Sequence, residues 1–239
     1  MVSVRGGSSE LAQLCLVDLV TAEVLINSLV QPTKQVTDWR TKYSGIRASD
    51  MALEVQNNRA LRGWKAAQME LWRYVDSDTV IVGHALQHDL KALHVIHHRV
   101  MDTSIMTRLA VSQECKRSWS LKVLCAELAD RDIQNHGAKG HICLEDTLGT
   151  REVFLQCILK PEKLMLWASK RLAEEQVKQL AQQLARSLHT ERANLTTIDC
   201  NMPYDEDEDD YESEVLWWSD IAEDLGWPHP DTGYDPWSD

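Results

Sequence analysis

Residues 78–95 read DTVIVGHALQHDLKALHV, and this stretch decides the fold class. Its first half is a short β-branched run that ends at Gly83 and His84, a pattern typical of a buried parallel strand. Its second half has the pattern of a helix that begins just past that strand. A strand followed at once by a helix indicates an α/β domain, in which functional side chains collect at strand ends.

The flanking segments continue this alternation. The predicted elements are a β-hairpin over 11–31, a polar loop over 32–45, a helical region over 50–76, a strand over 99–104, and helices over 120–130 and 143–158. Ser120 is the expected N-cap of the first of these last two helices. We therefore expect one α/β domain over residues 1–160.

Charge divides the chain unevenly. The net charge is −12, but 15 of the 37 acidic residues follow residue 198, where there is no Lys or Arg. Residues 1–198 therefore carry 25 basic against 22 acidic groups, a net charge of +3 that permits contact with a phosphate backbone. We expect residues 161–198 to form a charged helical extension without an obvious partner. Residues 199–239 are expected to be a disordered acidic tail with tryptophans, able to dock a protein partner.

Several protein classes are excluded. No apolar run approaches the ~18 residues of a membrane span, so no membrane association is expected. The first residues lack the apolar core of a signal peptide. Six cysteines without a Cys-x-x-Cys pair indicate reduced thiols in an intracellular protein, not disulfides or a zinc knuckle.

Three ionisable residues are candidates for chemistry. Asp89 lies just inside the helix that follows the buried strand, and His141 and Asp146 flank the start of another helix. A carboxylate at a strand-to-helix corner can hold a divalent cation, and a nearby histidine can deprotonate a metal-bound water. The residues together form a stronger signal than any one of them alone.

Four separated strings carry a resemblance to a known family. They are PTKQVTDWRTKYSGI (32–46), VGHALQHDLKAL (82–93), VMDTSIM (100–106) and the segment from Ser120 to Leu155 that contains GHICLED (140–146). Their order and spacing resemble the DEDDh 3′→5′ exonucleases, above all the RNA exonuclease branch in its fungal form. The resemblance covers roughly residues 1–158 and implies a ribonuclease-H-like mixed sheet flanked by helices.

The resemblance implies a function and a site. It implies cleavage of single-stranded RNA, or DNA, from the 3′ end with release of nucleoside 5′-monophosphates, assisted by two Mg²⁺ or Mn²⁺ ions. Asp89 and Asp146 would be metal ligands and His141 the general base. Trp39 and His84 are candidate substrate-binding residues, although Trp39 fits equally well as an anchor of its loop. A nuclear location is favoured over a cytoplasmic one by the resemblance alone.

The chain departs from the family at its start. The family's first motif, an Asp-x-Glu on the first central strand, is absent from this sequence. Compared with the family, the sequence starts at Met1, one residue after the position where the glutamate of that motif is expected. Neither Glu10 nor Asp18 has the spacing to replace it. Two carboxylates balance two divalent cations poorly, so we expect little or no turnover from the chain as it stands.

Two explanations of this departure remain open. A shortened chain is favoured, because an absent central strand leaves unpaired backbone edges inside the sheet. The other is a non-catalytic nucleic-acid-binding or scaffold protein with a relict site. The histidines at 84, 88, 94, 97 and 98 could suggest zinc, and Cys143 a nucleophile. The simpler interpretation of the histidines is a cluster on a helix surface. The simpler interpretation of Cys143 is a small residue that faces the core, with no cationic neighbour to lower its pKa.

Overall fold

The computed structural model describes the backbone of residues 1–137 and 140–195, and their side chains as far as residue 186. Residues 1–186 form one compact unit. The acidic tail expected over residues 199–239 lies outside the described residues, as does the end of the expected helical extension.

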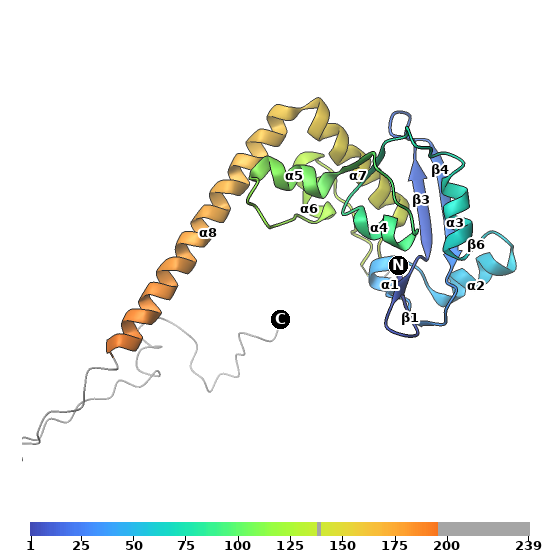
Figure 1. Cartoon of the computed structure of the whole chain (residues 1–239), viewed down its shortest axis with the longest axis horizontal. Helices are drawn as coiled ribbons and strands as arrows, with labels where there is room; N and C mark the ends of the chain where they lie inside the picture. The colour runs from blue at the N-terminus through green and yellow to red at the C-terminus, as the bar shows by residue number, and fades with distance from the viewer. Residues whose placement is uncertain (138–139, 196–239) are drawn as a thin grey trace, which may run out of the picture. The chain divides into compact units, whose positions relative to one another are not determined.

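Strands and helices alternate along the compact unit, as the sequence predicts (Figure 1). The strands are β1 (Val2–Val4), β2 (Ser9–Glu10), β3 (Gln13–Val17), β4 (Val24–Gln31), β5 (Val36–Asp38), β6 (Leu61–Arg62), β7 (Ile81–Gly83) and β8 (Val100–Asp102). The helices are α1 (Thr41–Ser44), α2 (Ala48–Gln56), α3 (Gly63–Leu71), α4 (Gln87–Ala92), α5 (Thr103–Val111), α6 (Leu121–Leu128), α7 (Cys143–Leu159) and α8 (Pro161–Leu195).

The strands combine parallel and antiparallel pairing in three small sheets, ordered β2-β1-β5, β3-β4-β6 and β7-β8. β3 and β4 form an antiparallel hairpin, whereas β6 runs parallel to β4 and β8 runs parallel to β7. Within the part of the chain that is described, β3 pairs only with β4 and β7 only with β8. Helix α7 packs against both β3 and β7 and so connects the two sheets.

Most of the predicted elements are confirmed. The hairpin is β3 and β4, the buried strand is β7, the following strand is β8, and the two later helices are α6 and α7. The Ser120 hydroxyl caps α6 by accepting a hydrogen bond from the amide of Val123. A side-chain oxygen at this position satisfies an amide that has no partner within the helix.

The single helical region predicted over residues 50–76 is wrong. Helix α2 ends at Gln56, and Asn58 then adopts a left-handed backbone with φ of 52°. Asparagine tolerates this conformation, which a continuing helix cannot contain. The chain next forms β6 beside β4, and α3 begins at Gly63. The predicted loop over residues 32–45 also contains β5 and the short helix α1.

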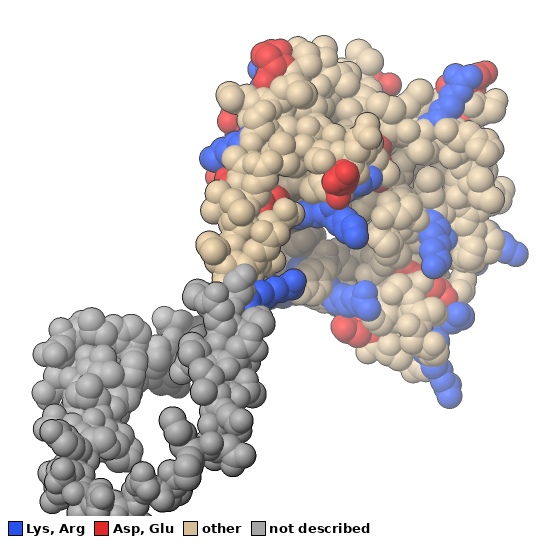
Figure 2. Space-filling model, turned by 60° about the vertical axis from the view of Figure 1, so that its left-hand side comes forward, with Lys and Arg blue, Asp and Glu red and all other residues tan. Residues whose placement is uncertain are grey.

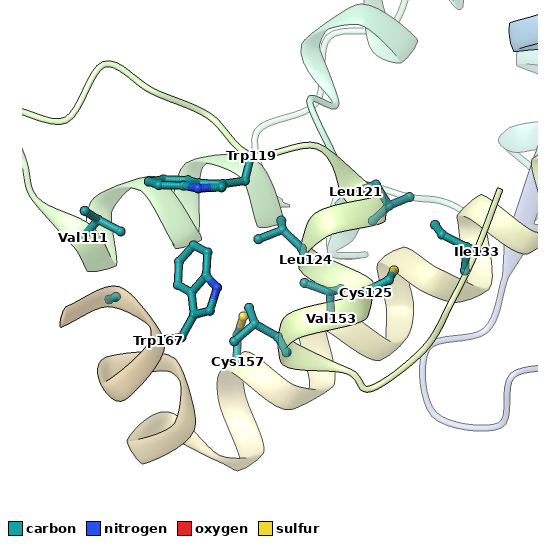
Figure 3. Packing of buried hydrophobic residues seen from close by; sticks show 11 residues of the cluster. Val111, Trp119, Leu121, Leu124, Cys125, Ile133, Val153, Cys157 and Trp167 are labelled. Carbon is teal, nitrogen blue, oxygen red and sulfur yellow. The ribbon is translucent and has the colours of Figure 1, made fainter. Parts of the chain in front are cut away.

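The largest apolar cluster joins α5, α6, α7 and the first turns of α8 (Figure 3). The rings of Trp119 and Trp167 meet edge to face, with 5.0 Å between their centroids. Leu124 and Val153 pack in the same cluster and are fully buried. Two further clusters lie under the hairpin and α3, and around β1 and α2.

Helix α8 has a partner, contrary to the sequence-based expectation. Trp167 is buried, and its indole nitrogen donates to Glu127 of α6 over 2.7 Å. Arg171, one turn further on, pairs with the same carboxylate, and Lys163 pairs with Asp130 at 2.7 Å. The i, i+4 spacing places Trp167 and Arg171 on one face of the helix, which α6 covers.

Among the helices of the described residues, none combines the length and the apolar character needed to pass through a membrane.

Candidate active site

A buried carboxylate builds the corner between β7 and α4. Asp102, at the end of β8, accepts hydrogen bonds from the amides of Ala85 and Leu86, at 3.0 and 2.7 Å. It also accepts from the amide and the hydroxyl of Ser104, which makes it the N-cap of α5. Burial alone would raise the pKa of Asp102, but these hydrogen bonds outweigh burial and lower it. Asp102 is therefore an ionised brace that fixes where α4 begins.

His84 directly follows β7 and contacts Thr103, the residue that follows β8. Its Nδ1 is 3.0 Å from the hydroxyl of Thr103, which in turn donates to the carbonyl of Gly83. Desolvation lowers the pKa of the half-buried His84 imidazole. The structure thus gives this candidate substrate-binding residue a hydrogen-bonded place in the fold, and contact with substrate stays a prediction.

His141 and Asp146 are brought together at the start of α7. The His141 Nδ1 and one Asp146 oxygen are 3.5 Å apart, and both side chains are about one-third exposed, at 32% and 29%. The other Asp146 oxygen accepts a hydrogen bond from the side-chain amide of Gln134 at 2.8 Å. Asp146 also falls within the first turn of α7, where the helix dipole favours a negative charge. The pair combines an accessible imidazole with an oriented carboxylate.

Asp89 approaches the same region from α4. Its side chain is exposed, yet the protein around it raises the pKa of the carboxyl, chiefly through desolvation. The positive charge of the Met1 amino group opposes that shift. Asp89 and Asp146 both act electrostatically on Cys143. His141 and Asp146 therefore meet at the first turn of α7, and Asp89 acts electrostatically on the same turn from α4.

Cys143 differs from its sequence-based interpretation. It is half-buried beside this site and does not simply face the core. A hydrogen bond with the Cys15 thiol is the main cause that lowers the Cys143 pKa, and the Met1 amino group adds a cationic neighbour. The same thiol contact and burial raise the pKa of Cys15. The expectation that no cationic group lies near Cys143 is wrong.

Trp39 is half-buried against the cluster around β1 and α2. Its carbonyl accepts a hydrogen bond from the Ser44 hydroxyl at 2.7 Å. These contacts support its interpretation as a loop anchor, and stacking on a terminal base stays a prediction.

The histidines that suggested a zinc alternative have separate contacts. His94 stacks on Trp64 with 4.1 Å between ring centroids, and the His97 ring nitrogen lies 2.7 Å from the Thr79 carbonyl. In residues 1–137 and 140–186, no group of three or more potential ligands is arranged to hold a metal ion. These contacts favour the surface-cluster interpretation over zinc.

The same finding limits the two-ion site. Asp89 and Asp146 are the carboxylates that would hold a divalent cation, and hard oxygen ligands suit Mg²⁺ and Mn²⁺. Their two negative charges offset only half of the four positive charges of two ions. The described residues therefore supply part of a two-ion site and do not fit the complete one.

Sequence reasoning missed the residues that support the site. Asp102 could have been found from its place before Thr-Ser after a strand, which is an N-cap pattern. Gln134 and the Cys15–Cys143 contact join segments more than ten residues apart and left no local pattern.

The strands and helices define a domain of the α/β class, and comparison with known proteins identifies its family. A family model for exonucleases, RNase_T, matches residues 1–154. The chain belongs to this family. The family is one of exonucleases, and the fold is the ribonuclease-H-like arrangement that the sequence resemblance implied.

Similar proteins carry matching names. RNA exonuclease 4 of Candida glabrata is 34% identical over 155 residues, which are 64% of this chain and 54% of the relative. Small RNA degrading nuclease 3 of Arabidopsis thaliana is 29% identical over 181 residues, 73% of this chain and 22% of the relative. RNA exonuclease 3 of Candida albicans is 28% identical over 144 residues, 60% of this chain and 33% of the relative. The chain spans about a fifth to a half of the length of these relatives.

Solved structures support the fold. The Saccharomyces cerevisiae Pan2 pseudoubiquitin hydrolase–RNA exonuclease module in complex with AAUUAA RNA gives a TM-score of 0.60 at 20% identity, over 74% of this chain and 31% of that chain. The Neurospora crassa Pan2 catalytic unit gives 0.53 at 20% identity, over 75% of this chain and 29% of that chain. This likeness concerns the arrangement of the backbone.

Proposed function

We propose that this chain is the nuclease domain of a 3′→5′ exonuclease that acts on single-stranded RNA and releases nucleoside 5′-monophosphates. One observation carries the proposal: within the exonuclease family match, His141 and Asp146 lie 3.5 Å apart at the start of α7. RNA as the substrate is supported by the names of the relatives and by the RNA-bound neighbour in fold.

The residues divide the work between them. His141 is accessible and would take the proton from an attacking water molecule. Asp146, held by Gln134, and Asp89 would hold the divalent cation, Mg²⁺ or Mn²⁺, whose role when bound is to stabilise the charge that develops on the phosphate. The Asp102 brace would keep Asp89 in place through the start of α4.

The surface is compatible with a polyanion. On the face drawn in Figure 2, several Lys and Arg side chains lie around a hollow in the described part of the molecule. Cations at the edge of a cleft attract a phosphate backbone and position it.

Turnover by residues 1–239 is expected to be slow, because two carboxylates provide only half of the charge that two divalent ions require. The alternative function, RNA binding without cleavage, rests on this same shortage of negative charge.

The location of the protein in the nucleus is a separate proposal, tested by imaging the chain fused at its carboxyl end to a fluorescent protein.

One experiment with two measurements tests the function. Excess protein is incubated with a 5′-labelled single-stranded RNA and Mg²⁺ or Mn²⁺, and both shortening and binding are followed, by gel and by fluorescence anisotropy. We expect slow shortening from the 3′ end, seen as a ladder of 5′-labelled products, with the released nucleoside 5′-monophosphate identified by chromatography.

Two variants define the site in that experiment. Asp146→Asn should abolish the shortening, whereas Glu162→Gln, an exposed change in the first turn of α8, should leave it unchanged. Binding without any shortening would replace the proposal by the alternative function. Absence of both RNA binding and RNA shortening would contradict the proposed function and the alternative function alike.

A further inference from the structure

Two glycines meet where the loop that carries His141 touches the end of α1. A Cβ atom added at Gly45 would lie 2.0 Å from the His141 carbonyl oxygen. A Cβ atom added at Gly140 would lie 1.9 Å from the Thr41 carbonyl oxygen and 2.9 Å from the Gly45 Cα. The obstructing atoms belong to the backbone, so no side chain can rotate to make room. The two segments are in direct backbone contact.

Backbone conformation alone does not account for these glycines. Gly45 and Gly140 have φ of 67° and 80°, in the region that favours glycine. Gly7 and Gly137 have φ of 76° and 56°, but a Cβ atom at either would meet nothing within 4 Å. Gly45 and Gly140 are therefore constrained twice, by conformation and by the close approach of another backbone segment.

The α1 side of the contact is rigidly held. The Gly45 amide donates to the Thr41 carbonyl at 2.9 Å, and the Thr41 hydroxyl donates to the Ile46 carbonyl at 2.8 Å. Ile46 is buried in the cluster around β1 and α2. Because its neighbour is anchored in this cluster, Gly45 is a fixed surface against which the His141 backbone rests.

The contact reaches the candidate base directly. His141 also meets the Tyr43 ring edge to face at 6.2 Å, and its Nδ1 lies 3.5 Å from Asp146. Gly45 and His141 both line a pocket of about 230 Å³ that extends to Cys143. The distance from α1 to the loop thus sets where the imidazole lies relative to the carboxylate.

We propose that Gly45 is a positioning residue for His141: its missing side chain lets the loop through Gly140 close against α1 and so holds the imidazole beside Asp146. The role assigned to His141 rests on the proposed exonuclease function. The contact itself is a structural claim that can be tested without activity.

The test compares Gly45→Ala with Gly7→Ala. Both replace a glycine of similar positive φ, so their backbone strain is comparable, and only Gly45→Ala introduces the clash. The readout is the NMR chemical shifts of the His141 ring, measured in the full chain at one fixed pH. We expect Gly45→Ala to change these chemical shifts and Gly7→Ala to leave them unchanged.

A second pair approaches the contact from the other side. Gly140→Ala should displace the same His141 signals, whereas Gly137→Ala, in the same loop but with open space around it, should not. In the unmodified protein, nuclear Overhauser contacts should join the Gly45 and Gly140 α-protons, which keeps the proposal testable where a variant does not fold. Absence of those contacts would overturn it, as would unchanged His141 signals in folded Gly45→Ala.

Activity adds a third measurement that separates this inference from the function. If the unmodified chain shortens RNA, Gly45→Ala should lower the rate by about 10²-fold with little change in RNA affinity, as for a misplaced catalytic group. If the chain does not shorten RNA at all, the proposed function fails, and the NMR comparison still decides the role of Gly45.

Discussion

The helical end of the domain and its candidate active site are built in different ways. Around Trp119 and Trp167, four helices join apolar faces that their own periodicity specifies. Around His141 and Asp89, short segments are held by a buried carboxylate, a pair of glycines and a few hydrogen bonds. The helical region stabilises the fold through the apolar area that it buries. The candidate active site instead positions its side chains through individual contacts. Mutations in the helical region should therefore lower the free energy of unfolding strongly and leave the geometry of the candidate active site unchanged. Mutations around the site should change its geometry and lower the free energy of unfolding less.

The largest expected effect is in the helical region. Trp167→Ala removes a buried ring from the cluster and should lower the free energy of unfolding by about 3–5 kcal/mol. Urea unfolding measures the loss, and the His141 NMR signals of the folded variant should be unchanged. Trp72→Ala, at a side chain that is 42% exposed, is the control and should cost much less. Equal costs for the two variants would contradict the proposed core.

The Asp102 brace should have the next largest effect, because it serves both regions. Asp102→Ala leaves the amides of Ala85, Leu86 and Ser104 without their acceptor and should cost about 2–3 kcal/mol. Unlike the Trp167 change, it should also displace Asp89 and alter the NMR signal of its carboxyl. Asp76→Ala, which removes the acceptor of an exposed turn, is the matched control and should leave Asp89 unaffected.

The same residue predicts an acid dependence. Because hydrogen bonds lower the folded-state pKa of Asp102, its contribution to stability is complete above the unfolded value of about 3.9. That contribution is lost as the pH falls through the lower folded-state value. Asp102→Asn should flatten this part of the curve of unfolding free energy against pH. A curve of unchanged steepness would mean that other carboxyl groups cause the dependence.

A smaller effect should come from the cap of α6. Ser120→Ala removes the acceptor for the Val123 amide and should cost about 1 kcal/mol. Thermal unfolding is the measurement, with Ser118→Ala, two residues earlier and exposed, as the control. The NMR signals of His141 should not change in Ser120→Ala, because α6 belongs to the helical region and not to the candidate active site.

The smallest expected effect concerns His84. Burial lowers its pKa in the folded protein, so below about 6.5 the unfolded chain takes up the proton first and stability declines. The decline stops once the pH is below the folded-state value. His84→Gln should remove this slope between pH 6.5 and the acid limb, whereas the same change at exposed His88 should leave it in place.

The contrast between the regions also explains what the sequence revealed. The helices α6 and α7 and the hairpin were predictable because apolar periodicity and a serine cap are local signals. The break at Asn58 was missed because helical spacing continues on both sides of it, and a left-handed asparagine changes no apolar position. Likewise, Gly45 stands in the sequence as an ordinary turn residue. Its contact with His141 joins positions 96 residues apart, and only the folded backbone reveals it.

The position of the Met1 amino group has a practical consequence. The charge on this group acts on Asp89 and Cys143, so a dye or purification tag joined to Met1 would alter the electrostatics of the candidate active site. Affinity handles and dyes for work on this protein belong at its carboxyl end.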